Sequence, residues 1–212
     1  MNHPLTIRRA WWRLLRLIGM NKLSWDKQFK AGVWWHLPRS ADMLSLVAGL
    51  CRGGRIIEFG CGEGSLPFLL PSGSYASYLG YDISGLAIRR AQRHASAAGA
   101  ANVRFAQCDM AQWDGNQSAF LVVLEECLYY LSPDDCAAFL ARCSRCLEAD
   151  GSMLVIVHSA TKHQKTLSVC RRVCQVRDEI QLGGRTYLTL DPRPPHPAAT
   201  PRHHSMAQSN DR

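Results

Sequence analysis

The segment from Arg55 to Gly64 constrains the fold more than any other part of the chain. It reads RIIEFGCGEG: a short apolar run carries Glu58 near its end, and glycines then stand at alternate positions. Alternate glycines let the backbone turn tightly and approach a ligand with its amide hydrogens. In an α/β sheet, such a loop lies at the carboxyl end of the first strand, where ligands bind. The sequence therefore predicts a ligand-binding loop after a buried strand.

Apolar runs alternate with helix-like stretches from Arg55 onward, which predicts an α/β protein with an open, doubly wound, mostly parallel sheet. Ser132 and Pro133 indicate the start of a helix that we expect to run to Gly151. Gly183-Gly184 predicts an antiparallel hairpin at the end of the domain. The seven expected strands are 55–59, 78–81, 103–106, 121–124, 153–157, 175–181 and 185–190.

Acidic residues stand at or near the ends of the first three predicted strands. Glu58 lies in the first strand, Asp82 ends the second and Asp109 follows the third. Asp82 is placed to accept hydrogen bonds from a ribose diol. The dinucleotide fingerprint G-x-G-x-x-G is not matched, because Ser65 stands where its third glycine belongs. The alternative for the three acids is that they cap neighbouring helices.

With an acid two residues before G-x-G-x-G, the sequence resembles the class I S-adenosylmethionine-dependent methyltransferases. The segment VRFAQCDM, ending at Met110, is similar to the third-strand segment of that family. The resemblance covers about residues 23–190 and implies a Rossmann-like methyltransferase fold with S-adenosylmethionine as cofactor and S-adenosylhomocysteine as product. It implies that the first loop surrounds the methionine and ribose, that Asp82 takes the ribose hydroxyls, and that Asp109 takes the adenine amino group. The implied cofactor-binding residues are Glu58, Gly60, Cys61, Gly62, Gly64, Asp82, Ile83, Asp109 and Met110.

Two further segments resemble bacterial relatives. Residues 121–131, LVVLEECLYYL, look like the fourth-strand motif of proteins related to the nodulation N-methyltransferase, and residues 28–34 look like a segment of relatives from polysaccharide clusters. This resemblance implies a small-molecule substrate, a sugar or saccharide, methylated on nitrogen or oxygen. Phe120 and Trp35 depart from the acids common at those positions, and the departures concern the substrate more than the cofactor.

Glu126, Tyr129 and His158 are the candidate catalytic residues. Glu126 comes just after the fourth strand and is a candidate to contact or deprotonate the acceptor, or else to orient the loop of Tyr129. Tyr129 either walls the site or packs in the core. His158 ends the fifth strand, where an imidazole acts as a base or as a structural group. Trp34 and His36 belong to a lid over the cofactor or to the core.

Charge and composition limit the partners and the compartment that we expect for this protein. The net charge is +8, and the first 22 residues hold four arginines, a lysine and no acid. We expect residues 1–22 to form a basic amphipathic helix that packs on the domain or contacts a membrane surface, and residues 191–212 to be a disordered Pro-rich tail. The absence of a long apolar run or a signal peptide, together with nine cysteines, predicts a cytoplasmic protein with reduced thiols.

Other functions stay open. An RNA methyltransferase is the alternative that the positive charge suggests, although nucleic acid is disfavoured because the basic residues concentrate at one end. A non-catalytic cofactor-binding module is a second alternative, which Phe120 and Trp35 favour and the intact glycine loop opposes. No metal is predicted, since Cys143-x-x-Cys146 and Cys170-x-x-x-Cys174 lie within expected helices without zinc-type turns.

Overall fold

The computed structural model describes residues 21–33 and 39–192. Nearly all of the predicted amphipathic helix of residues 1–22 and of the Pro-rich tail of residues 191–212 therefore lies outside the described residues. The same holds for Trp34, Trp35 and His36.

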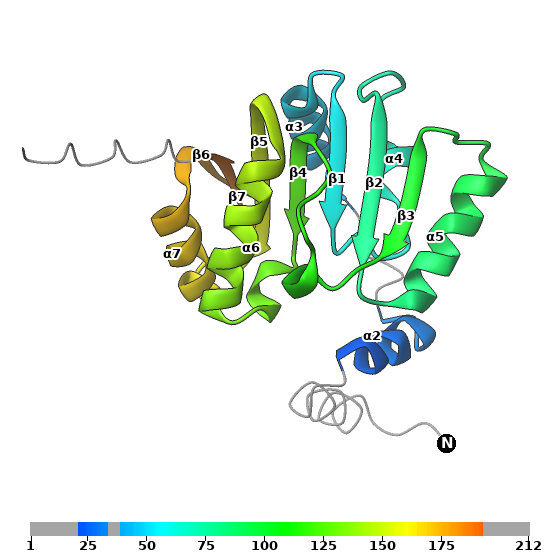
Figure 1. Cartoon of the computed structure of the whole chain (residues 1–212), viewed down its shortest axis with the longest axis horizontal. Coiled ribbons are helices and arrows are strands. Elements are labelled where there is room, and N and C mark those ends of the chain that lie inside the picture. Colours follow the sequence, from blue (N-terminus) through cyan, green and yellow to red (C-terminus); the bar gives the residue numbers. More distant parts are fainter. Residues whose placement is uncertain (1–20, 34–38, 193–212) are drawn as a thin grey trace, which may run out of the picture.

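A seven-stranded sheet forms the centre of the described chain, in the order β3-β2-β1-β4-β5-β7-β6 (Figure 1). Neighbouring strands among the first five are parallel, whereas β7 runs antiparallel to both β5 and β6. The strands are β1 (Arg55–Phe59), β2 (Ser77–Asp82), β3 (Val103–Gln107), β4 (Ala119–Glu125), β5 (Leu147–His158), β6 (Gln175–Leu182) and β7 (Arg185–Asp191). The structure thus confirms the predicted open α/β sheet with its C-terminal antiparallel hairpin.

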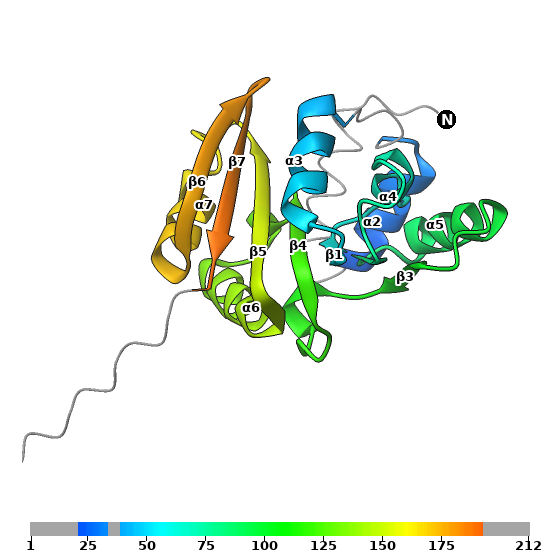
Figure 2. The ribbon, with the colours of Figure 1, turned by 90° about the horizontal axis from the view of Figure 1, so that it is seen from above.

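Helices cover both faces of the sheet, as Figure 2 shows from above. One face carries α3 (Ala41–Cys51), α4 (Leu66–Leu69) and α5 (Gly85–Ala97), and the other carries α6 (Pro133–Cys146) and α7 (Gln164–Val173). Helix α2 (Asn21–Lys30) lies beyond the carboxyl ends of β1–β3 and contacts α5 (Figure 1). Two short 3-10 helices, η1 (Met110–Gln112) and η2 (Leu128–Tyr130), follow β3 and β4. None of the described helices is long and apolar enough to cross a membrane.

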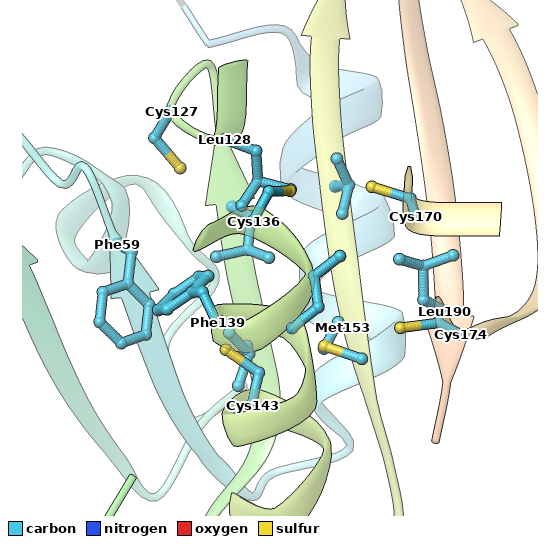
Figure 3. Packing of buried hydrophobic residues seen from close by; sticks show 14 of the residues in the cluster. Phe59, Cys127, Leu128, Cys136, Phe139, Cys143, Met153, Cys170, Cys174 and Leu190 are labelled. Carbon is cyan, nitrogen blue, oxygen red and sulfur yellow. The ribbon is translucent and has the colours of Figure 1, made fainter. Parts of the chain in front are cut away.

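The core between the sheet and α6–α7 is rich in cysteine. Phe59, Phe139 and Met153 pack there with buried thiols (Figure 3). Each thiol occupies the place of a small apolar side chain, which is the usual environment of a buried free cysteine. All nine cysteines are free, and the described residues contain no cluster of three or more metal-ligating side chains.

The prediction that the helix after Ser132 runs to Gly151 is wrong. Helix α6 ends at Cys146 and β5 begins at Leu147, which pairs with Ala119 of β4 before the register shifts. Gly151 serves a close backbone approach instead of a helix end. A Cβ there would lie 2.9 Å from the carbonyl oxygens of both Glu148 and Phe120.

Candidate active site

The glycine loop after β1 has a backbone that depends on its glycines. Gly60, Gly62 and Gly64 all have positive φ, at 74°, 56° and 75°. At Gly64 space is lacking as well, because a Cβ would lie 2.4 Å from the ring of Phe105. The loop starts against β2, where the carbonyl of Tyr81 accepts hydrogen bonds from the amides of Gly60 and Cys61. The glycine pattern is therefore explained by backbone conformation and by close packing.

Asp82 ties the glycine loop to the start of α5. Its Oδ2 accepts a hydrogen bond from the Gly62 amide at 3.0 Å, and its Oδ1 accepts one from the Ser84 amide at 2.8 Å. Burial raises the pKa of Asp82 to about 6, and these two hydrogen bonds oppose that rise. Each carboxylate oxygen keeps a further lone pair. Asp82 thus has a structural role in the loop and retains the capacity to accept from a diol.

Helix α2 is fastened to the same corner of the sheet. Asp26 accepts hydrogen bonds at Oδ1 from the Ser84 hydroxyl at 2.5 Å and from the Leu86 amide at 3.1 Å. The ring of Phe29 lies 3.6 Å from the position that a Cβ on Gly62 would take. Helix α2 therefore closes over the glycine loop and over the first turn of α5.

Glu58 lies in a buried cluster of charges. Its Oε1 accepts from Arg39 Nη2 at 2.6 Å, and its Oε2 accepts from the Tyr78 hydroxyl. Arg39 Nε also pairs with Glu125 Oε2 at 3.0 Å, and Arg185 Nη1 pairs with Glu125 Oε1 at 2.7 Å. We call Glu58, Arg39, Glu125 and Arg185 the arginine–glutamate cluster. This cluster joins the carboxyl ends of β1 and β4 to the start of β7, and it lies behind the glycine loop.

The two ends of the Arg39–Glu58 pair have distinct electrostatic surroundings. Burial raises the pKa of Glu58, and Arg39 opposes that rise. Burial alone would lower the pKa of Arg39, but Glu58 and Glu125 together raise it. Arg39 Nη1 is buried and has no hydrogen-bond partner among the described residues. A buried, charged donor without a partner is costly, so this atom marks a position that suits an anionic ligand group.

The sequence analysis missed Arg39, Glu125 and Arg185. Their partners are 19 to 86 residues away along the chain, so no local spacing links them. The only signal in the sequence was the doubled acid Glu125-Glu126 at the end of the fourth strand.

The expected adenine-side residues lie in the loops after β2 and β3. Asp109 caps η1, since its Oδ1 accepts a hydrogen bond from the Ala111 amide at 3.0 Å, and Met110 begins that helix. The Ile83 carbonyl accepts from Gln107 Nε2 at 2.8 Å, which joins the two loops. Asp109 thus performs the capping role that the alternative reading foresaw. The cap uses Asp109 Oδ1, and the other carboxylate oxygen has no hydrogen-bond partner among the described residues.

The three candidate catalytic residues meet at the carboxyl ends of β4 and β5. Glu126 Oε2 lies 2.5 Å from His158 Nδ1 and accepts from the Tyr129 hydroxyl at 2.8 Å. Glu126 Oε1 accepts from the His158 backbone amide at 2.5 Å. With its proton on Nδ1, the imidazole donates to Glu126 and presents an unprotonated Nε2, and about half of its side chain is exposed. Glu126 has φ of +52°, a strained conformation for a non-glycine residue that is common at functional sites.

Aromatic rings surround this carboxylate–imidazole pair. His163 stacks on Tyr129 with ring centroids 3.8 Å apart, and Tyr130 meets Trp25 of α2 edge-on at 4.9 Å. Burial, Tyr130 and Glu126 raise the pKa of Tyr129, so its hydroxyl keeps its proton and donates it. Burial, His158 and Lys162 lower the pKa of His163. The edge of the sheet therefore has a loop side at β1–β3 and a carboxylate–imidazole side at β4–β5.

Residues 56–151 match a family model described as a methyltransferase domain. This match extends from β1 to the start of β5, which is just under half of the chain. No curated protein matches the sequence, whereas solved structures match the fold. The N-methyltransferase NodS from Bradyrhizobium japonicum WM9, in complex with S-adenosyl-L-homocysteine, superposes with a TM-score of 0.60 at 16% identity, over 71% of this chain and 86% of that one.

Two other solved methyltransferases are similar to the same degree. The O-methyltransferase NcsB1 from neocarzinostatin biosynthesis, with S-adenosylmethionine and 2-hydroxy-5-methyl naphthoic acid, has a TM-score of 0.61 at 16% identity, over 86% of this chain and 61% of that one. An S-adenosylmethionine-dependent methyltransferase from Clostridium acetobutylicum ATCC 824 has a TM-score of 0.59 at 12% identity, over 69% of this chain and 86% of that one. Together with the domain match, these structures confirm the predicted enzyme class, an S-adenosylmethionine-dependent methyltransferase, and its cofactor.

Proposed function

We propose that this methyltransferase moves the methyl group of S-adenosylmethionine to a hydroxyl oxygen of a small molecule, and that the acceptor is a sugar or saccharide. The observation that carries the proposal is the contact of 2.5 Å between Glu126 Oε2 and His158 Nδ1 at the ends of β4 and β5. A hydroxyl group must lose its proton as it accepts a methyl group, and a positioned imidazole takes up such a proton. An amine acceptor, in contrast, needs only to arrive deprotonated.

The chain's own residues fit the cofactor. The amides of the glycine loop and the carboxylate of Asp82 would hold the ribose, with Ile83, Asp109 and Met110 around the adenine. The unpartnered Arg39 Nη1 would pair with the methionine carboxylate. When bound, the cofactor supplies a methyl group already activated on a sulfonium sulfur. The protein's remaining task is to place and desolvate the acceptor.

Glu126 and Tyr129 act through His158 in this proposal. The carboxylate holds the imidazole in the tautomer that exposes Nε2, and it stabilises the imidazolium that forms when Nε2 takes the acceptor's proton. The Tyr129 hydroxyl donates to Glu126 and so fixes the position of the carboxylate. His158 is therefore the proposed catalytic base, and Glu126 and Tyr129 are positioning residues.

A saccharide acceptor is supported by the surroundings of His158 and by the sequence. Tyr130 is 41% exposed and contacts both Trp25 and Tyr129, and the Tyr129 ring in turn meets the His158 ring edge-on, which gives a row of aromatic rings leading to the proposed base. The segment LVVLEECLYYL resembles relatives of the nodulation N-methyltransferase, and a kinship with that group is part of the proposal. Contact of residues 1–22 with a membrane surface and a cytoplasmic location also remain proposals from the sequence.

One departure from the family pattern has a structural explanation. Phe120 lies near the amino end of β4, where its Cβ would be 2.4 Å from a Cβ on Gly54. That is the opposite edge of the sheet from the glycine loop and from His158. The side chain at this position therefore gives no support to a non-catalytic module.

The test compares His158→Asn and Glu126→Gln with the wild-type enzyme on a panel of sugars and aminosugars. Transfer of labelled methyl is measured across pH, and S-adenosylhomocysteine binding is measured by calorimetry. We expect His158→Asn to lower turnover about 100-fold with unchanged cofactor affinity, and Glu126→Gln to lower it less. His94→Asn, on the outer face of α5, is the matched control.

Each part of the proposal can fail separately. Equal turnover in His158→Asn and wild type would give the imidazole a structural role. Turnover confined to amino groups and insensitive to His158 would replace O-methylation by N-methylation.

A further inference from the structure

Helix α5 and strand β3 form a strongly basic part of the molecule. Residues 85–107 contain four arginines and no acidic residue. Arg90 pairs with Glu63 at 2.6 Å, whereas Arg89, Arg93 and Arg104 are exposed with no ion pair to any described residue. The exposed guanidinium groups of Arg89 and Arg93, one helical turn apart on α5, create a positive potential that no described acidic residue pairs with.

The positive surface continues onto α2. Arg90 Nη1 donates to the Phe29 carbonyl at 3.3 Å, so α5 and the end of α2 are in direct contact, and Lys30 is exposed there. A cavity of about 450 Å³ lies between α5 and β3, and Gln92 and Arg104 are among its lining residues. We call Lys30, Arg89 and Arg93 the basic face.

Exposed aliphatic side chains border the basic face. Leu23 on α2 and Val33 just after it are 38% and 39% exposed. Leu69 of α4 is 49% exposed, and its neighbour Phe68 packs on His94 of α5 with ring centroids 4.2 Å apart. Among the described residues of α5 and β3, no exposed Phe, Tyr or Trp stands between the arginines to form a base-stacking surface.

We infer that the basic face docks on an anionic membrane surface. Lysine and arginine attract anionic lipid headgroups, and bordering aliphatic side chains gain by entering the headgroup boundary. The chain that leads into α2 has the same chemistry in its sequence, with Arg9, Arg13 and Arg16 among Trp11, Leu14 and Ile18. This inference concerns α2 and α5 and is independent of the methyl acceptor proposed above.

The experiment measures sedimentation of the full chain with vesicles of phosphatidylcholine, with and without phosphatidylglycerol, at two salt concentrations. The test variant is Lys30→Gln/Arg89→Gln/Arg93→Gln. The control variant, Arg145→Gln/Lys165→Gln/Arg172→Gln, removes the same charge from exposed positions on α6 and α7. Calorimetry with S-adenosylhomocysteine checks that both variants are folded.

We expect the wild type to bind only the anionic vesicles, and less at high salt. Each removed charge lowers membrane partitioning about fivefold, so the test variant should bind about 100-fold more weakly, while the control stays near wild type. Equal losses in the two variants, or no binding of the wild type to anionic vesicles, would overturn the inference. Binding of mixed-sequence RNA that only the test variant loses, with vesicle binding intact, would assign the face to RNA instead.

Discussion

The two sides of the sheet's carboxyl edge are organised in different ways. In and around the glycine loop, polar groups are held by the backbone: Asp82 accepts from the amides of Gly62 and Ser84, and Gly60 donates to the Tyr81 carbonyl. At β4–β5, most of the contacts come from other side chains, as in the pairs Glu126–His158 and Glu125–Arg185. Backbone-held groups depend on conformation, whereas side-chain pairs depend on which residues the fold brings together. The two sides should therefore respond to different substitutions.

The largest expected effect is on the loop side. In Gly64→Ala the new Cβ clashes with the Phe105 ring, and the alanine must also adopt a positive φ. We therefore expect a loss of about 4 kcal/mol in the free energy of unfolding. Urea denaturation measures it. Gly73→Ala is the control, since Gly73 has φ of +77° but open space, and should lose only about 1 kcal/mol. Equal losses in the two variants would show that conformation alone, without packing, accounts for the loop.

The next effect concerns the arginine–glutamate cluster. In Arg39→Met the buried Glu58 loses its ion-pair partner, so we expect a loss of about 3 kcal/mol in the free energy of unfolding at neutral pH. Arg185→Met removes a more exposed partner of Glu125 and should cost about 1 kcal/mol. A loss in Arg39→Met no larger than in Arg185→Met would mean that Glu58 takes a proton and needs no cation.

The smallest effect is on cofactor affinity at Asp82. Ribose hydroxyls donate to an ionised carboxylate, and the pKa of Asp82 is raised to about 6, so we expect S-adenosylhomocysteine affinity to fall about tenfold from pH 7 to pH 5. Asp82→Asn should bind about tenfold more weakly at pH 7 and lose this pH dependence, as calorimetry would show. Asp178→Asn, an exposed acid on β6, is the control. An unchanged pH profile in Asp82→Asn would remove this carboxylate from the ribose site.

The same group has the opposite pH dependence in folding. Because its pKa is raised in the folded protein, the folded state binds the proton more tightly than the unfolded state does. Its contribution to stability therefore decreases as pH rises from about 4 to about 6. A gain in affinity and a loss in stability over that range would together identify Asp82 as the titrating group.

This difference between the two sides also explains what the sequence predicts well. The glycine loop, Asp82 and the succession of strands along the chain follow from local spacing, because each depends on residues close in sequence or on strand ends. Glu126, Tyr129 and His158 were singled out by their positions at strand ends, but their mutual contacts come from the parallel pairing of β4 with β5. Arg39 and Arg185 were missed because only tertiary structure brings them to the glutamates. The helix end at Gly151 was misplaced because its glycine serves a backbone contact between strands.

Arg39 connects the cofactor side of the site with the acceptor side. Its one guanidinium group contacts Glu58 in β1 and Glu125 in β4, and Glu125 precedes Glu126, the partner of His158. A cofactor carboxylate drawn to Nη1 would therefore change the charge balance felt by the acceptor side. Any such influence is mutual, since binding free energies at two linked sites must couple equally in both directions. We expect acceptor and cofactor each to tighten or loosen the other's binding by the same factor, which makes this enzyme's two substrates cooperative ligands.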